Sequence, residues 1–173
     1  MRRIFLLLGF AVLLSSSALA QQPTHKGYRR SSVQSDLKPV YQRWVSEDVA
    51  YIITPDEKRA FMMLRSDDER EQFIDVFWRR RDMNPATSEN EYRVEHYARI
   101  AYANQNFAFG DVAGWRTDRG RIYITHGKPD ETRKSTSGEV WVYRSAAGGH
   151  NIEVEFVDVN GTGNYQLRLP NQQ

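Results

Sequence analysis

The chain has 173 residues and no cysteine, so it forms no disulfide and uses neither thiol catalysis nor thiolate metal ligands. Its 24 lysines and arginines exceed its 22 acidic residues, but two of the basic residues, Arg2 and Arg3, lie in a predicted signal peptide. The mature chain then carries no formal net charge, which argues against a general electrostatic attraction to nucleic acid.

Residues 1–20 have the three parts of a secretory signal peptide. A basic start is followed by an apolar run over residues 4–14 and by the small-residue cleavage pattern of Ala18 and Ala20. The apolar run is too short for a membrane span, which needs about 20 apolar residues. We therefore expect cleavage before Gln21, export through a Sec-type signal to the periplasm or the medium, and no transmembrane span in the mature chain.

The mature chain is predicted to consist of a leader and one domain. Residues 21–38 are polar and follow no apolar period, which is typical of a segment that buries too little surface to offset its ordering entropy. Residues 39–170 are enough for a single domain with its own core. We expect a flexible leader followed by this domain.

About four helices are predicted in the first part of the domain. Apolar residues at helical intervals predict a helix from Pro39 to about Ile53. Two capping boxes, at residues 54–57 and 66–69, predict the starts of the second and third helices. A longer fourth helix is expected from Thr87 or Ser88 to about Phe107.

The third helix ends in three arginines. Trp78 belongs to its apolar stripe, residues 79–81 are all arginine, and Asp82 follows. Basic side chains in a last turn complement the helix dipole, so we interpret Arg81 and its neighbours as a solvated helix end with Asp82 as a local partner. An anion or nucleic-acid site is the less favoured alternative.

The second part of the domain is predicted to be a four-stranded antiparallel meander. Apolar and polar residues alternate over residues 121–125, 152–157 and 165–169, and residues 140–143 form a further short strand pattern. Turn residues separate these runs, so sequence neighbours are expected to pair. The fold class is therefore α+β, with the helices packed on the apolar face of the sheet.

A short motif joins the helical part to the strand part: Gly114-Trp115-Arg116-Thr117-Asp118, followed by Gly120. Glycines permit unusual backbone angles, the tryptophan supplies an apolar anchor, and Thr117 and Asp118 can bond nearby backbone groups. These residue types predict a structural corner. Asp118 is expected to cap the turn into the first strand, or to pair with Arg119 or Arg121.

At this motif the chain resembles the GWxTD family of bacterial proteins. The likeness covers about residues 44–169 and extends to other runs of the family pattern: residues 77–82, Glu91 with His96-Tyr97, residues 100–104 and residues 118–124. The resemblance implies an exported bacterial domain and no particular activity. Trp78, Arg81 and Asp82 are accordingly expected to have structural roles, like the corner residues.

No catalytic signature stands out. The chain has no His-x-x-x-His spacing, no Gly-x-Ser-x-Gly elbow around a nucleophile and no phosphate loop, and no cofactor is expected. A metal or hydrolytic site would have to be assembled from His96, His126 and Asp118, near the corner. A groove for a peptide or carbohydrate is a further possibility, with four aromatic residues as its candidate lining: Trp115, Tyr123, Trp141 and Tyr143.

The sequence therefore supports two hypotheses for the function. The preferred one is a non-enzymatic envelope or secreted module that interacts with an envelope protein or a glycan. The alternative is a hydrolase or metal-dependent enzyme with a site near the corner at residues 114–118. Convergence of His96, His126 and a carboxylate in one partly exposed pocket would favour the enzyme.

Overall fold

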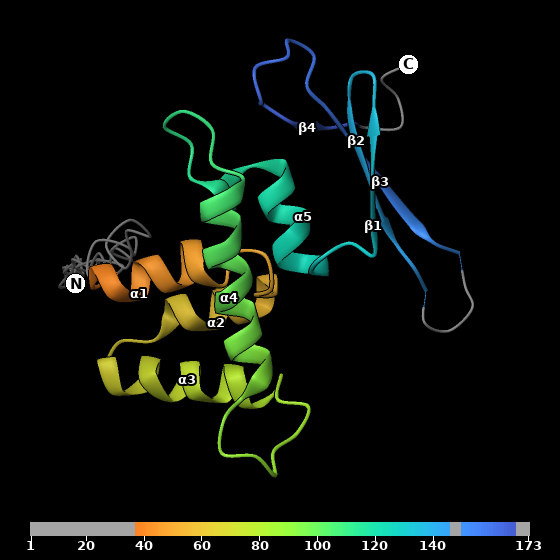
Figure 1. The fold of residues 1–173 in the computed structure, drawn as a ribbon. Helices are drawn as coiled ribbons and strands as arrows, with labels where there is room; N and C mark the ends of the chain where they lie inside the picture. Colours follow the sequence, from red (N-terminus) through yellow and green to blue (C-terminus); the bar gives the residue numbers. More distant parts are fainter. Residues whose placement is uncertain (1–36, 146–149, 169–173) are drawn as a thin grey trace, which may run out of the picture. The chain divides into compact units, whose positions relative to one another are not determined.

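The computed structural model describes residues 37–145 and 150–168 (Figure 1). The predicted signal peptide and most of the predicted leader lie outside these residues. No helix in the described ranges is long and apolar enough to cross a membrane. The helical elements come first in the chain: α1 (Pro39–Arg43), a π-helical turn η1 (Trp44–Asp48), α2 (Pro55–Met63), α3 (Asp67–Arg79), α4 (Glu91–Asn106), a 3₁₀ turn η2 (Gly114–Arg116) and α5 (Asp118–His126).

Both predicted capping boxes are present. The Thr54 hydroxyl accepts from the Glu57 backbone N–H at the start of α2, and the Glu57 carboxylate accepts from Thr54 N. Ser66 and Glu69 form the same reciprocal pair at α3. The first predicted helix is shorter than expected, because α1 and η1 end at Asp48.

The fourth helix begins later than predicted. Its N-cap is Asn90, whose side-chain oxygen accepts from Arg93 N at 2.8 Å. The Thr87 hydroxyl instead donates to the carbonyl of Asn84, so Thr87 belongs to the preceding loop. The end of α4 at Asn106, just before Phe107, agrees with the prediction.

The predicted first strand, residues 121–125, is wrong, because these residues lie in α5. Ile122 and Ile124 are both buried and mimic a strand pattern. Residues two apart on a helix point to nearly opposite sides, so their joint burial means that α5 is covered on two sides. It contacts α4 on one side and packs into the same apolar cluster as Trp141 and Phe156 of the sheet.

The sheet in the described residues is nevertheless a four-stranded antiparallel meander of order β1-β2-β3-β4, so the α+β fold class is confirmed. Its strands are β1 (Glu131–Ser135), β2 (Gly138–Tyr143), β3 (Ile152–Val157) and β4 (Gln166–Leu167). β1 replaces the mispredicted strand. It has five exposed polar residues and no apolar period, which explains why periodicity does not reveal it.

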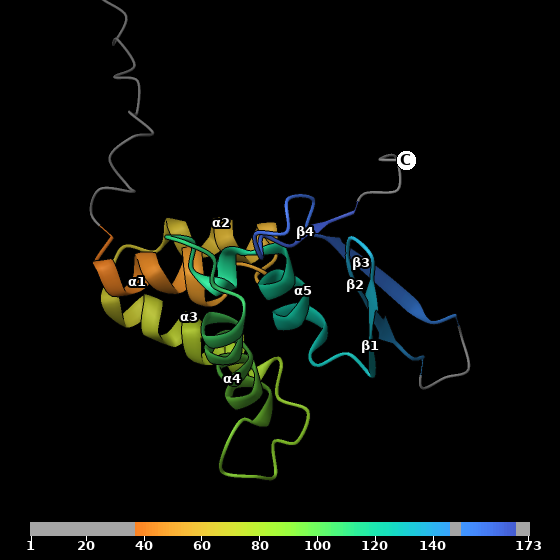
Figure 2. The ribbon, with the colours of Figure 1, turned by 45° about the horizontal axis from the view of Figure 1, so that its top comes forward.

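Two apolar clusters stabilise the described residues, one among α1, η1, α2 and α3 and one between α4, α5 and the sheet. Figure 2 shows the backbone of these elements, with α5 between α4 and the strands. The first is rich in aromatic residues, including Trp44, Phe61, Phe77 and Trp78. We call it the helical cluster. The second, the sheet cluster, has as its buried members Ala103, Phe107, Ile122, Ile124, Trp141 and Phe156.

Candidate functional site

The two glycines of the corner are required by close backbone packing. A Cβ on Gly114 would lie 1.9 Å from the carbonyl oxygen of Ala103 in α4, and a Cβ on Gly120 would lie 1.9 Å from the carbonyl oxygen of Gly114. Neither glycine has a positive φ. The prediction of unusual backbone angles at these positions is therefore wrong, and close approach of three segments is the reason for both glycines.

Trp115 and Thr117 join this corner to the helices around it. Trp115 N donates to the side-chain oxygen of Asn104 in α4, and the Tyr51 hydroxyl donates to the Trp115 carbonyl at 3.0 Å. Trp115 is only partly buried, with its ring packed against Tyr51. Thr117 is the N-cap of α5, because its hydroxyl accepts from Gly120 N.

Asp118 ties the start of α5 to the last strand. One carboxylate oxygen accepts from Leu167 N in β4 at 2.8 Å, and the other pairs with the Arg121 guanidinium at 3.0 Å. The predicted pairing with Arg121 is present, but the cap is Thr117 and the element that follows is a helix. The bond to Leu167 spans 49 residues, so no local sequence pattern indicates it.

Arg81 is held inside the helical part rather than solvated. Its guanidinium forms two hydrogen bonds to the Glu57 carboxylate, at 2.8 and 3.0 Å, donates to the Ile52 carbonyl and lies 3.6 Å from the centroid of the Phe77 ring. Burial raises the pKa of Glu57, but the hydrogen bonds from Arg81 and Thr54 outweigh it, and the pKa is lowered. The ion pair fixes α3 against α2.

The other two residues of this run also differ in role. Asp82 is not the partner of the arginines, since its carboxylate accepts from Asn84 N in the loop after α3. Trp78 is buried in the helical cluster, with its ring packed on Phe77 and on Tyr97. The interpretation as a solvated helix end holds for Arg79 and Arg80, which are exposed.

The residues of the alternative metal site do not come together. Asp118 and His126 are the first and last residues of α5, about 12 Å apart along the helix axis. His96 lies in α4 and is buried. Within residues 37–145 and 150–168, no three histidines or carboxylates are grouped so that they could hold a metal ion.

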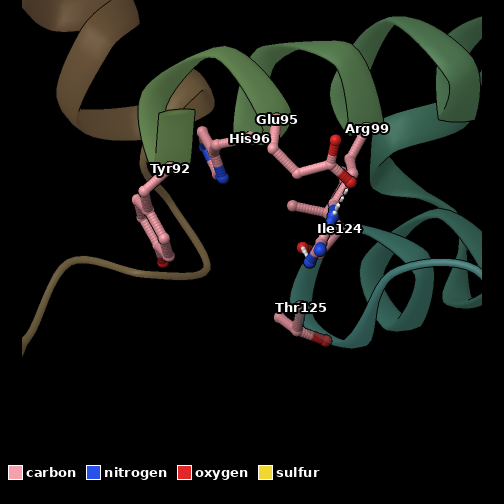
Figure 3. A pocket seen from close by; sticks show the side chains of 6 residues that line it. All are labelled: Tyr92, Glu95, His96, Arg99, Ile124 and Thr125. Carbon is pink, nitrogen blue, oxygen red and sulfur yellow. Dashed lines mark hydrogen bonds and ion pairs between the residues drawn. The ribbon is translucent and has the colours of Figure 1, made fainter. Parts of the chain in front are cut away.

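His96 lies at a small polar hollow between α4 and the end of α5 (Figure 3). Its Nε2 is 2.6 Å from the Asp48 carbonyl oxygen, and because a carbonyl only accepts, Nε2 carries the hydrogen. Burial lowers the pKa of His96, which favours the neutral ring. The hollow has a volume of about 70 Å³, which suits a few water molecules better than a substrate.

Arg99 occupies the side of this hollow that faces α5. Its guanidinium pairs with Glu95 at 2.9 Å and donates to the Ile124 carbonyl at 3.4 Å, near the C-terminal end of α5 (Figure 3). A cation at this position complements the dipole of the helix end. The charged groups of the hollow thus stabilise the packing of the two helices.

A larger, open recess of about 220 Å³ lies between α4, α5 and the first two strands. We call it the aromatic recess, and its lining residues are Tyr102, Phe107, Arg119, Tyr123, Lys128, Pro129, Thr132, Glu139 and Trp141. Tyr102 stacks on Tyr123 with ring centroids 4.5 Å apart, and 43% of Tyr102 is exposed. The ring of Tyr102 and part of the Tyr123 ring are therefore accessible to a ligand, whereas Phe107 and Trp141 form the buried floor.

A shielded ion pair helps to form the wall of the recess. Arg119 and Glu139 lie 3.4 Å apart, with 17% and 14% of their side chains exposed. The Glu139 carboxylate also accepts from Trp141 Nε1, and the guanidinium of Arg119 lies 3.9 Å from the centroid of the Tyr165 ring. These contacts hold both charged groups in fixed positions.

The motif at the corner identifies the family. A profile of the GWxTD domain matches residues 20–172. The chain belongs to the GWxTD domain family. No curated protein and no solved structure matches it.

In this GWxTD protein, sequence reasoning finds the corner and part of the recess. Trp141 and Tyr123 line the recess, whereas the Tyr143 hydroxyl donates to the Gly127 carbonyl and Trp115 packs at the corner. The sequence does not single out Tyr102, because its exposure on α4 beside Tyr123 is decided by the packing of α4 against α5. Reasoning from the sequence also misses the pair of Arg119 and Glu139, because those residues come from α5 and β2.

Proposed function

We propose that this protein is an exported, non-enzymatic interaction module of the cell envelope that binds its partner, an envelope protein or a glycan, at the aromatic recess. One observation carries the proposal. The side-chain polar groups of Thr117 and Asp118 already have bonding partners, whereas the recess presents the exposed ring of Tyr102, stacked on the half-buried Tyr123. Exposed aromatic surface around fixed polar groups is typical of binding sites.

The enzyme alternative has less geometric support. A hydrolase needs a nucleophile or an activated water beside a positioned base. His96 binds a backbone carbonyl through Nε2 beside a hollow that Arg99 partly fills, and Asp118 binds Leu167 N and Arg121. These groups already have structural partners, and no described pocket brings them together with His126.

The recess is tested by affinity capture from the envelope fraction of the source organism. The bait is the mature chain, residues 21–173, compared with Tyr102→Ser in the recess and with Tyr92→Ser as the matched control. Both tyrosines are partly exposed on α4, but Tyr92 lies at the His96 hollow. We expect the wild type and Tyr92→Ser to retain a partner that Tyr102→Ser loses, although the two variants melt at similar temperatures. Capture that does not depend on Tyr102 contradicts a binding role for the recess.

Export is tested separately by N-terminal sequencing of the protein recovered from cells. The expected first residue is Gln21, since the pattern at Ala18 and Ala20 is a cleavage signal. A chain that still carries residues 1–20 in the soluble cytoplasmic fraction contradicts export.

A further inference from the structure

The free edge of β1 lies beside the aromatic recess. β1 pairs only with β2 in the described sheet, and all five of its residues are exposed. In an antiparallel edge strand, alternate residues direct their N–H and C=O groups away from the neighbouring strand. These groups are available to a further strand, which is how extended peptides bind many sheets.

The strand register relates this edge to the recess. Thr132 lies opposite Trp141 and Lys134 lies opposite Glu139, so all four side chains are on the face of the sheet that the helices cover. Thr132, Glu139 and Trp141 line the recess. A strand added to β1 would therefore direct every second side chain towards the recess.

The charges on this face indicate which peptide would fit. The side-chain amines of Lys128 and Lys134 have no hydrogen bond or ion pair with any described residue. The one acidic residue of the recess, Glu139, is already bonded to Arg119 and Trp141. The recess side of β1 thus carries uncompensated positive charge, which acidic side chains would complement.

The opposite face of the sheet has no such excess. Its arginines are paired with glutamates: Arg133 with Glu131 of the same strand and with Glu153 of β3, Arg144 with Glu131, and Arg168 with Glu155. Lysines and arginines on an edge strand commonly prevent unwanted pairing, and those of the outer face fit that role. The unpaired lysines are the ones on the recess side.

We propose that β1 binds an extended peptide as a fifth strand, with aromatic or large apolar side chains of the peptide in the recess and acidic side chains beside Lys128 and Lys134. This inference rests on the proposed function, because it names the partner class of the same recess. A strand supplies backbone bonds along β1, and the recess selects alternate side chains.

The test uses an array of synthetic ten-residue peptides in which aromatic and polar residues alternate. Acidic peptides are compared with matched peptides that carry lysine at the same positions. The strongest binder is then titrated against the mature chain by fluorescence anisotropy. It is also made in two N-methylated forms, one for each set of alternate amides. We expect the acidic peptides to bind, and one N-methylated form to bind at least tenfold more weakly, because it lacks the donors for β1.

Two protein variants complete the test. Lys128→Glu combined with Lys134→Glu should weaken binding of the acidic peptide at least tenfold, whereas Lys58→Glu, at an exposed lysine of α2, should leave it unchanged. Equal binding of both N-methylated forms, with loss in Tyr102→Ser, overturns strand addition but keeps the recess as a binding site. Absence of binding by every array peptide at 1 mM overturns strand addition, and the capture experiment then decides the proposed function independently.

Discussion

Single residues of the corner stabilise the fold in two ways: Gly114 permits close backbone packing, and Thr117 and Asp118 form hydrogen bonds. Gly114 allows the backbone of η2 to contact Ala103, Thr117 caps α5, and Asp118 binds Leu167. These roles need a glycine, a small hydroxyl and a short carboxylate, which is the residue set of the family motif. The sequence predicts that these motif residues are structural. It does not predict their partners, because Ala103 and Leu167 are remote from the motif in the chain.

Gly114→Ala should destabilise the protein strongly. The added Cβ would meet the Ala103 carbonyl at 1.9 Å, and since both sides are backbone, one segment must move. Overpacking typically costs about 1 to 3 kcal/mol of unfolding free energy, and because backbone meets backbone here we expect the upper end of that range. The control is Gly161→Ala, where no atom lies within 4 Å and only the positive φ opposes the side chain, at about 1 kcal/mol. Denaturant unfolding compares the two, and equal losses would contradict the packing role.

Asp118→Ala should release β4. It leaves Leu167 N without its carboxylate acceptor, at a cost of about 1 to 2 kcal/mol, whereas Asp118→Asn keeps an acceptor and should cost about 1 kcal/mol or less. Hydrogen exchange at the Leu167 amide reports the difference locally. The matched control is Asp130→Ala, which removes the acceptor of Arg144 N and should leave Leu167 protected. Unchanged exchange at Leu167 in Asp118→Ala would rule out this contact.

At the scale of elements, start and stop signals are better guides than periodicity. Thr117 with Asp118, then Gly127 and Pro129, are ordinary signals for the start and the end of a helix, and they bracket α5 closely. The alternation of Ile122 with Ile124 points to a strand only because α5 is covered on two sides. β1 has no apolar residue at all, and only its pairing with β2 makes it a strand. The helices with capping boxes and the alternating strands β2 and β3 were predictable, whereas α5 and β1, which depend on tertiary packing, were not.

The contact between α4 and η1 should make stability depend on pH. Burial lowers the pKa of His96, while Asp48 acts in the opposite direction and Arg99 and Arg81 reinforce the lowering. The unfolded chain therefore takes up a proton near pH 6.5 that the folded chain does not bind. The stability contributed by neutral His96 is present above this pH and decreases as the pH falls towards the folded pKa, by at most about 1.4 kcal/mol per pH unit.

His96→Gln isolates this effect, because glutamine does not titrate and can still donate to the Asp48 carbonyl. Unfolding free energies at pH 7.5 and 5.5 should differ less in His96→Gln than in the wild type. The comparison variant is His126→Gln, which removes a histidine at the end of α5 and leaves the contact between His96 and the Asp48 carbonyl in place. If His96→Gln kept the full pH dependence of the wild type, another group would be responsible.

At the scale of the whole described domain, Tyr51 connects the two apolar clusters. Its chain neighbours Ile52 and Ile53 pack against the helical cluster, whereas its own ring packs against the sheet cluster. Its hydroxyl donates to the Trp115 carbonyl, and burial raises its pKa, so the phenol keeps its proton. The corner and the segment after η1 are thus parts of one contact between the clusters, and we expect the clusters to unfold together.

Tyr51→Phe tests this expectation, because it removes one hydrogen bond and leaves the ring in place. The free energy of unfolding should fall by about 1 kcal/mol. Native-state hydrogen exchange should show the same decrease in amide protection at Phe61 in the helical cluster and at Phe156 in the sheet cluster. Tyr92→Phe, which changes a partly exposed tyrosine outside both clusters, should alter neither. A decrease confined to Phe156 would mean that the sheet opens separately from the helices. A peptide bound in the recess would then be expected to oppose this separate opening of the sheet, because the recess lies between α4, α5 and the first two strands.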